Sequence, residues 1–194
     1  SNSASLFVER SIAMGMGADV IAIDLSTKRL AELDDLFDNR ITTLYSNMDN
    51  IESSVVASDL VIGAVLIPGA KAPKLVTRKM ISKMEKGSVV VDIAVDQGGC
   101  IETCKPTTHQ EPTFEVDEVI HYCVANMPGA VARTSTYALT NVTLEYARLI
   151  ARLGVDDAAL KSGPLKKGIN VYKGDLVYKQ VALDLNLPYT ELKL

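Results

Sequence analysis

The fold of this chain is limited most strongly by two apolar runs, residues 59–66 (DLVIGAVL) and 88–95 (SVVVDIAV). A strand with one solvent-exposed face alternates apolar and polar residues, whereas a continuous apolar run is typical of a strand buried on both faces. Stretches with helical periodicity separate these runs and supply the covering layers. The pattern predicts an α/β fold, a doubly wound parallel sheet with helices on both faces.

The preceding and following segments extend this alternation. Ser26 is the expected N-cap of its helix, and Gly17 is expected to end the helix before it. Further strands are predicted at residues 20–25, 41–45 and 121–126, and helices at 5–17, 26–37, 50–57 and 77–84.

Beyond Pro128 the pattern changes. Residues 130–153 predict one long helix, which is uncommon inside a compact doubly wound domain. Residues 172–175 (YKGD) predict a turn that leads into a helix ending near Asn186. The last part of the chain is therefore expected to belong to a different structural unit.

Composition argues against several classes of partner. The chain has 194 residues and a net charge of −4, so no basic stripe is available for nucleic acid. Its apolar runs are shorter than the roughly 20 residues of a membrane helix, and its N-terminus (SNSAS) lacks the basic region of a secretory signal. We expect no nucleic-acid partner and no membrane segment. A hydrophobic content of 47% is enough for a sizeable core and for burial against another subunit.

The three cysteines, Cys100, Cys104 and Cys123, show no disulfide framework. An odd number without regular spacing indicates reduced thiols and a cytoplasmic protein. Cys100 and Cys104 precede His109, but the spacing matches no common zinc pattern and Pro106 interrupts it. No metal site is predicted.

The first candidate binding residue is Asp24, at the end of the strand predicted over residues 20–25. Ligands of doubly wound sheets bind outside the carboxyl ends of the strands. A carboxylate there suits the two ribose hydroxyls of an adenosine and repels a 2′-phosphate, which favours NAD over NADP. A solvated turn residue is an equal alternative. No G-x-G-x-x-G opens the first helix, so the motif that holds the pyrophosphate is missing.

Three successive strand ends point to one crevice. Val65 and Leu66 end one predicted strand, Asp96 closes the next in front of Gln-Gly-Gly, and Asn126 ends the last. Asp92 lies inside the strand predicted over residues 88–95, where a buried carboxylate needs partners. Each position alone is explained by a strand-to-helix turn, but together they favour a binding site over a plain core.

Four stretches carry a family resemblance: MGMGADVIAIDL, SDLVIGAVLIPGAKAPKLVT, VVVDIAVDQGGCIETCKPTTH and HYCVANMPGAVARTSTYALTN. They resemble alanine dehydrogenase, over nearly the whole chain. The related α subunit of proton-translocating transhydrogenase shares the architecture, but its strand ends differ from the DQGG and NMPG found here. The resemblance implies reversible oxidative deamination of L-alanine to pyruvate and ammonia, with hydride passing to NAD, in a homohexamer.

The resemblance also implies roles for individual residues. Asp24 is the implied ribose ligand, and Asp96 is implied to face the reacting carbon, where it handles a proton or orders water. The other implied cofactor contacts are Ser46 by the adenine, Val65 and Leu66 along the cofactor, and Ile93, Val124, Asn126 and Met127 around the nicotinamide.

Members of this family are longer than the chain. Their substrate domain, with the Lys and His that hold and protonate the keto acid, and the first strand with its Gly-rich turn precede the matched region. The resemblance therefore implies an incomplete Rossmann-like sheet that lacks its first strand. It implies a truncated NAD-binding domain at 1–128, a connecting helix at 129–153 and a C-terminal piece of the substrate domain at 154–194. The chain alone is expected to be inactive, and the alternatives are a non-catalytic oligomerising remnant or a transhydrogenase α-subunit domain.

A missing first strand would leave two inner sheet edges with unpaired N–H and C=O groups. Each buried unpaired group costs about 1–3 kcal/mol, so several would remove a typical domain stability of about 5–15 kcal/mol. The flanking strands then pair directly, another chain supplies a strand, or the chain is a piece of a longer protein. We expect one of the last two.

Overall fold

The computed structural model describes residues 12–65, 67 and 72–194. The described residues form two compact units. The first unit comprises the described residues from 12 to 125, except Ile67. The second unit comprises Ile67 and residues 126–194. Within these ranges, no helix combines the length and the apolar character that a membrane span requires.

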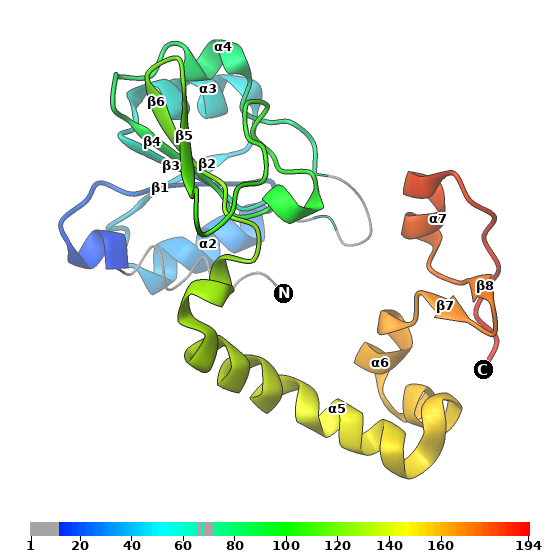
Figure 1. Cartoon of the computed structure of the whole chain (residues 1–194). Coiled ribbons are helices and arrows are strands. Elements are labelled where there is room, and N and C mark those ends of the chain that lie inside the picture. Colours follow the sequence, from blue (N-terminus) through cyan, green and yellow to red (C-terminus); the bar gives the residue numbers. More distant parts are fainter. Residues whose placement is uncertain (1–11, 66, 68–71) are drawn as a thin grey trace. The chain divides into compact units, whose positions relative to one another are not determined.

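The first unit is an α/β structure with two separate sheets (Figure 1). In one sheet, β1 (Ile21–Asp24) pairs in parallel with β2 (Thr42–Tyr45). In the other, the order is β3-β4-β6-β5, formed by β3 (Leu60–Gly63), β4 (Val89–Asp92), β6 (Val119–Tyr122) and β5 (Thr113–Val116). All neighbours in this sheet are parallel except β5, which runs antiparallel to β6 at the edge. The predicted α/β fold with parallel strands is confirmed.

Side-chain caps determine where the helices of this unit begin. α2 (Thr27–Leu36) follows Ser26, whose hydroxyl accepts the backbone N–H of Arg29 at 3.2 Å, as the sequence predicts. α3 (Met48–Ala57) and α4 (Arg78–Ile81) begin in the same way after Asn47 and Thr77. Figure 1 shows α2 on one side of the strands and α3 with α4 on the other.

The described part of the first helix ends as predicted at Gly17. This glycine has a φ of 85°, in the left-handed region that glycine adopts without strain. The backbone N–H of Ala18 then donates to the carbonyl of Ala13 at 3.0 Å and closes the helix end. The preceding predicted residues, 5–11, lie outside the described ranges.

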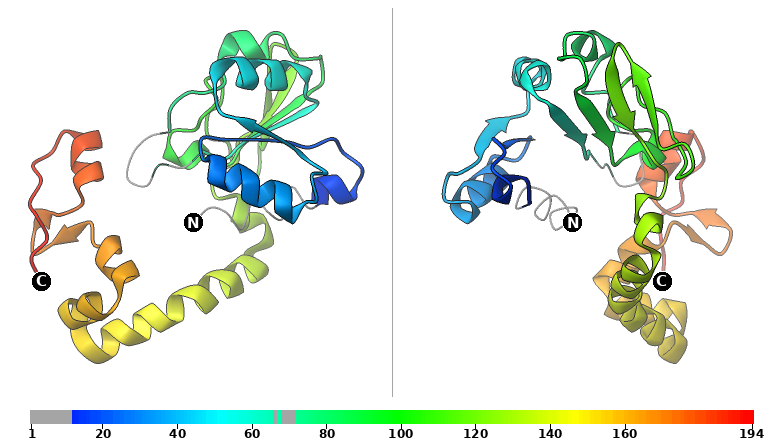
Figure 2. Two further views of the ribbon diagram at one scale, coloured as in Figure 1. Left: turned by 180° about the vertical axis from the view of Figure 1, so that it is seen from behind. Right: turned by 60° about the vertical axis from the view of Figure 1, so that its left-hand side comes forward.

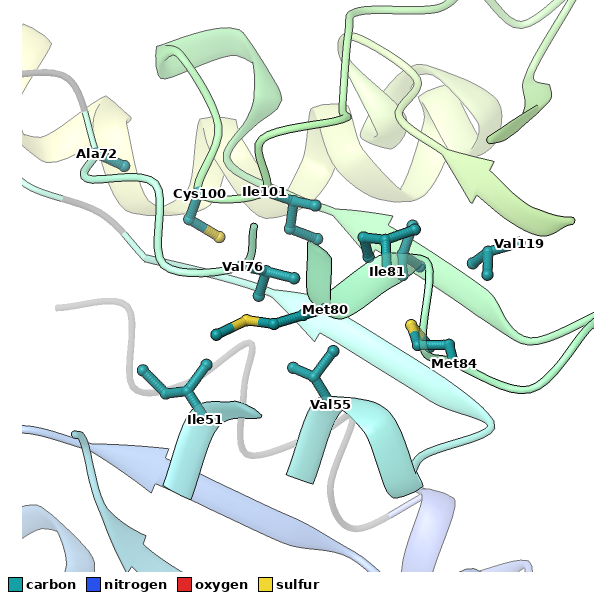
Figure 3. Packing of buried hydrophobic residues seen from close by; sticks show 11 residues of the cluster. Ile51, Val55, Ala72, Val76, Met80, Ile81, Met84, Cys100, Ile101 and Val119 are labelled. Atoms are coloured by element: carbon teal, nitrogen blue, oxygen red, sulfur yellow. The ribbon is translucent and has the colours of Figure 1, made fainter. Parts of the chain in front are cut away.

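The largest apolar cluster lies between α3, α4 and the four-stranded sheet (Figure 3). Ile51 and Val55 project from α3 toward Met80 of α4 in this view. Val119 of β6 is completely buried in the same cluster. Ile23 of β1 also packs against it, so side-chain burial holds the first sheet to the rest of the unit.

Two strands end earlier than their apolar runs suggest. β4 ends at Asp92, so the prediction that Asp96 closes this strand is wrong: Asp96 lies in the short helix η1 (Val95–Gln97). β6 likewise ends at Tyr122, and the prediction that Asn126 ends a strand is also wrong. The apolar run continues past Asp92 because Ala94 and Val95 are also buried, although they lie in the loop after β4 and not in the hydrogen-bonded strand.

The antiparallel strand β5 was not predicted. It joins β6 through Asp117 and Glu118, which both have positive φ values, 54° and 63°. Hairpin turns of this type usually contain Asn-Gly or Asp-Gly, and the absence of glycine removes the sequence signal. Phe114 of β5 lies against His121 of β6, with ring centroids 5.0 Å apart.

The strands β1 and β3 belong to different sheets. Direct pairing of these flanking strands, one of the three expected outcomes, is therefore not what the described residues show. The contacts between β1 and α3, together with the packing of Ile23, connect the two sheets instead. That a first strand is missing stays a prediction.

The second unit is mainly helical, with one small hairpin (Figure 2). η2 (Met127–Val131) leads into α5 (Ala132–Lys161), in which Gly154 has a φ of 76° and a ψ of 174° and separates two helical segments. The first segment corresponds to the predicted long helix. α6 (Gly163–Gly168), β7 (Val171–Tyr172), β8 (Asp175–Leu176) and α7 (Lys179–Leu185) follow. The predicted turn at 172–175 and the helix end at Asn186 are confirmed.

Candidate functional site

The carboxyl ends of β1 and β2 bring two predicted site residues together. Asp24 is the last residue of β1, and its backbone carbonyl accepts the N–H of Ser46 at 3.0 Å. Its side-chain Oδ1 accepts the N–H of Ser26 at 2.8 Å. Because Ser26 also caps α2, one tight turn fixes the strand end, the carboxylate and the helix start. Asp24 is partly exposed, and its carboxylate has capacity for further hydrogen bonds.

The ends of β3 and β4 bring together a second pair, Val65 and Ile93. The backbone N–H of Ile93 donates to the carbonyl of Gly63 at 2.8 Å, just past the paired part of these strands. Since β3 and β4 are parallel, Val65 and Ile93 follow the same edge of the sheet. Ile93 is 37% exposed and Val65 is partly buried. Leu66, predicted beside Val65, lies outside the described residues.

Asp92 is a fully buried carboxylate at the end of β4. Its Oδ1 accepts the backbone N–H of Ala94 at 3.0 Å, and its Oδ2 accepts those of Cys100 at 2.9 Å and Ile101 at 3.2 Å. The expectation that this carboxylate needs hydrogen-bond partners is confirmed. The loop over residues 94–101 therefore has both ends attached to one charge.

Lys74 holds the same loop through its carbonyl groups. Its Nζ donates to the backbone oxygen of Gly98 at 2.5 Å and to that of Ile101 at 3.3 Å. The cation thus binds acceptors of the loop while Asp92 binds its donors. Sequence reasoning missed Lys74 because it lies between the apolar run at 59–66 and the helix predicted at 77–84, without a motif that marks it.

Asp96 is carried by this loop and is exposed to solvent. The chain reverses after it through Gly98 and Gly99, whose φ values are 93° and 67°. A Cβ on Gly99 would lie 2.5 Å from Oδ2 of Asp92, so the loop can close around the carboxylate only with glycine at this position.

The remaining predicted site residues follow β6. Val124 is 1% exposed and forms an isolated parallel bridge with Thr107. Asn126 has a φ of 56° and a ψ of 49° and is the first residue of the second unit, followed by Met127 at the start of η2. The structure thus places Val124 in one unit and Asn126 with Met127 in the other. Their convergence with Asp96 on one crevice stays a prediction.

His121 is fully buried between two hydrogen-bonding partners. Its Nδ1 lies 2.9 Å from the carbonyl of Val119, which can only accept, so Nδ1 carries the proton. Its Nε2 lies 2.7 Å from Oγ1 of Thr103 and accepts that hydroxyl proton. Burial lowers the pKa of His121 and favours this neutral form.

The three thiols are free, and no group of three His, Cys, Asp or Glu side chains in the described ranges could hold a metal ion. Burial raises the pKa of the Cys100 thiol to about 11, and the neighbouring Asp92 carboxylate adds to this effect. Cys100 is therefore a neutral core residue at neutral pH.

An open hollow of about 570 Å³ lies on the second unit, beside α5. None of the predicted site residues lines it. Its lining consists of Glu145, Tyr146, Arg148, Leu149, Arg152 and Ser162.

Comparison with known families and sequences gives a consistent result. The sequence model of the family described as "Alanine dehydrogenase/PNT, C-terminal domain" matches residues 10–179. A curated alanine dehydrogenase from Staphylococcus haemolyticus is 57% identical over 94% of this chain and 49% of its own length. One from Methanococcus maripaludis is 57% identical over 92% of this chain and 48% of its own length. The chain spans about half the length of the curated relatives it matches.

The solved structures that are similar to the chain include an L-alanine dehydrogenase and a transhydrogenase. An L-alanine dehydrogenase superposes with a TM-score of 0.79 at 47% identity, over 91% of this chain and 49% of that chain. A transhydrogenase from Sinorhizobium meliloti superposes with a TM-score of 0.55 at 32% identity, over 64% of this chain and 35% of that chain. Both the sequence and the fold are thus more similar to the L-alanine dehydrogenase.

Proposed function

The chain belongs to the alanine dehydrogenase/PNT family, whose C-terminal domain it matches, and from this premise we propose that it forms the NAD-binding part of an L-alanine dehydrogenase. The observation that carries the proposal is the pair Asp24 and Ser46 at the carboxyl ends of two parallel strands. The reaction proposed for the whole enzyme is reversible oxidative deamination of L-alanine to pyruvate and ammonia.

Asp24 supplies the chemistry that an adenosine ribose requires. Its carboxylate already accepts one backbone N–H, from Ser26, and retains acceptor capacity for the two ribose hydroxyls. Its negative charge disfavours a 2′-phosphate, which supports NAD rather than NADP. Ser46, whose N–H is held by the Asp24 carbonyl, lies beside the adenine in this arrangement.

Asp96 is the proposed proton-handling or water-ordering group. Bound NAD would supply the hydride acceptor. Asp92 and Lys74 hold the loop that carries Asp96 through its N–H and C=O groups, which limits the positions that the Asp96 carboxylate can take. The remaining proposed cofactor contacts are Val65, Leu66, Ile93, Val124, Asn126 and Met127.

Several wider properties are part of the same proposal. Turnover is expected to need the part of the relatives that this chain does not span, because the resemblance puts the substrate-holding Lys and His there. The proposed organisation is an NAD-binding domain at 1–128, a connecting helix at 129–153 and a piece of the substrate domain at 154–194. The enzyme is proposed to be a cytoplasmic homo-oligomer. The higher similarity to the L-alanine dehydrogenase structure supports this function over that of a transhydrogenase α subunit.

Calorimetric titration of the 194-residue chain with NADH tests the proposal. We expect weak but saturable binding of NADH, since no G-x-G-x-x-G motif is present to hold the pyrophosphate, and still weaker binding of NADPH. Asp24→Asn should weaken NADH binding about tenfold or more, since a hydrogen bond to a charged acceptor contributes about 1.5–3 kcal/mol. Asp35→Asn is the matched control, because Asp35 is an exposed carboxylate on α2. No saturable heat with NADH, or equal affinities for the two variants, would overturn the proposal.

A further inference from the structure

We propose that Lys74 is a positioning residue for the nicotinamide end of the cofactor site, because its ammonium joins the segment after β3 to the loop that carries Asp96. This loop, residues 94–101, is called the Asp96 loop below. The inference rests on the proposed function and deepens it, since it gives one exposed side chain the task of placing the Asp96 carboxylate. Backbone pairing, two hydrogen bonds from the ammonium and the space around Gly99 carry the argument.

Backbone pairing brings Lys74 to the Asp96 loop. The N–H of Val76 donates to the carbonyl of Cys100 at 3.2 Å, and the N–H of Glu102 donates to the carbonyl of Val76 at 2.8 Å. Val76 and Ile101 form a parallel bridge as a result. Lys74 lies two residues before Val76, so its side chain starts beside the second half of the loop.

The ammonium of Lys74 then bonds to the loop at two points. Nζ donates to the carbonyl of Gly98 at 2.5 Å and to that of Ile101 at 3.3 Å. Gly98 directly follows η1, and Asp96 is the middle residue of η1. The bond to Gly98 therefore fixes the backbone two residues away from Asp96. Hydrogen bonds from a charged donor are stronger than those between neutral groups.

Lys74 and Asp92 hold the same loop through opposite kinds of group. Oδ2 of Asp92 accepts the N–H groups of Cys100 and Ile101, whereas Lys74 binds carbonyl oxygens. A Cβ on Gly99 would lie 2.5 Å from Oδ2 of Asp92 and 3.6 Å from Nζ of Lys74, so both charged groups lie beside this glycine. The cation thus compensates a fully buried carboxylate at the point where the loop closes.

This arrangement connects the ends of two neighbouring strands. Lys74 follows β3 in the chain, as does Val65, whereas Ile93 and Asp96 follow β4. Without the ammonium, the Asp96 loop should open more often, and a ligand would have to order it on binding. The adenosine end of the proposed site should not respond, because Asp24 belongs to the other sheet.

Hydrogen exchange of the 194-residue chain, followed by mass spectrometry, tests whether Lys74 holds the loop. In Lys74→Met the peptide that contains residues 94–101 should exchange about threefold faster or more, because the loop loses two hydrogen bonds. Lys74→Arg should restore the protection, since a guanidinium can donate to two acceptors at once. Lys86→Met is the matched control: Lys86 is an exposed lysine whose Nζ lies 2.6 Å from Oε2 of Glu118, and its loss should leave this peptide unchanged.

Calorimetric titrations with NADH and with ADP-ribose test the role of Lys74 in binding. ADP-ribose contains the adenosine and both phosphates but lacks the nicotinamide. Lys74→Met should weaken NADH binding about three- to tenfold and ADP-ribose binding less than about twofold, since only the nicotinamide end meets the Asp96 loop. Lys74→Arg and Lys86→Met should keep the wild-type ratio of the two affinities. Asp24→Asn should weaken both ligands alike.

A general loss of structure would lower both affinities together, so an unchanged ratio in Lys74→Met would overturn the positioning role. Exchange over residues 94–101 at the wild-type rate would overturn it as well. The two proposals can fail separately. A wild-type chain that binds neither ligand contradicts the proposed function, and the exchange measurement then decides whether Lys74 positions the Asp96 loop. If Lys74→Met does not fold, Lys74→Gln takes its place in both measurements.

Discussion

The carboxylate of Asp92 accepts the backbone N–H of Cys100 at 2.9 Å, across a loop that leaves the end of β4 and returns to it. The same carboxylate accepts the N–H groups of Ala94 and Ile101. Asp96 lies between these attachment points, on η1. The buried carboxylate of Asp92 thus fixes the backbone of the loop that carries the exposed carboxylate of Asp96.

Asp92→Asn is expected to lower the free energy of unfolding by about 2–3 kcal/mol. The amide keeps one acceptor oxygen but directs its NH₂ group at backbone donors, and each unsatisfied buried group costs about 1–3 kcal/mol. Urea unfolding measures the change. Asp35→Asn, on the exposed face of α2, should stay within about 0.5 kcal/mol of the wild type. Equal losses in the two variants would contradict the role given to Asp92.

Gly99→Ala is expected to destabilise the chain more than Gly87→Ala. Both glycines have positive φ values, 67° and 85°, so alanine costs about 1–2 kcal/mol in backbone strain at either position. At Gly87 nothing lies within 4 Å of the added Cβ, whereas at Gly99 the Cβ also meets the Asp92 carboxylate. Urea midpoints of the two variants provide the comparison, and equal midpoints would show that the loop yields without cost.

Gly63→Ala is expected to be rescued by a second substitution at Cys100. A Cβ at residue 63 would lie 2.6 Å from the Cys100 sulfur, and such overpacking costs typically about 1–3 kcal/mol. Cys100→Ala removes the sulfur, so the double variant should be more stable than the sum of the two single changes allows. A double-mutant cycle of unfolding free energies measures this coupling. Simple additivity would mean that the close approach is relieved by other movements.

Protonation of His121 is expected to lower the free energy of unfolding of the chain in mild acid. Burial lowers the pKa of His121 below its ordinary value of 6.5, so the unfolded chain takes up a proton at a higher pH than the folded chain. Neutral His121 contributes fully to the free energy of unfolding above the pKa that it has in the unfolded chain. This contribution is lost as the pH falls through 6.5 toward the pKa of His121 in the folded chain.

Urea unfolding at a series of pH values tests this dependence on the wild type and on His121→Asn. Asparagine keeps a donor near the Val119 carbonyl but does not titrate, so the variant should be less stable at neutral pH and show a flatter decline below about pH 6.5. An unchanged slope would assign the acid sensitivity to other groups.

Local signals in the sequence predicted much of the first unit. Ser26 and Gly17 fixed helix ends because capping depends on a few neighbouring residues. The apolar runs around Val61 and Val90 predicted β3 and β4, since burial on both faces leaves a continuous apolar pattern. The apolar run before Asp24 likewise predicted that this residue lies at the end of a strand.

Contacts between distant segments were not predictable in this way. Lys74 bonds to carbonyls at Gly98 and Ile101, and nothing in its own neighbourhood indicates that. Asp96 was predicted at the end of a strand because the apolar residues after Asp92 look the same in a ladder and in a buried loop. The turn at Asp117 and Glu118 lacks the glycine that usually marks it.

The separation of β1–β2 from β3–β4–β6–β5 gives the unit a seam bridged by side chains such as Ile23. Asp24 and Ser46 lie on one side of that seam, and Val65 and Ile93 on the other. A dinucleotide in contact with all four residues would connect the two sheets, whose strands are hydrogen-bonded separately. Ligand binding would then make local opening of the unit rarer. Slower amide hydrogen exchange along β1 would therefore report ligand binding, as a titration does.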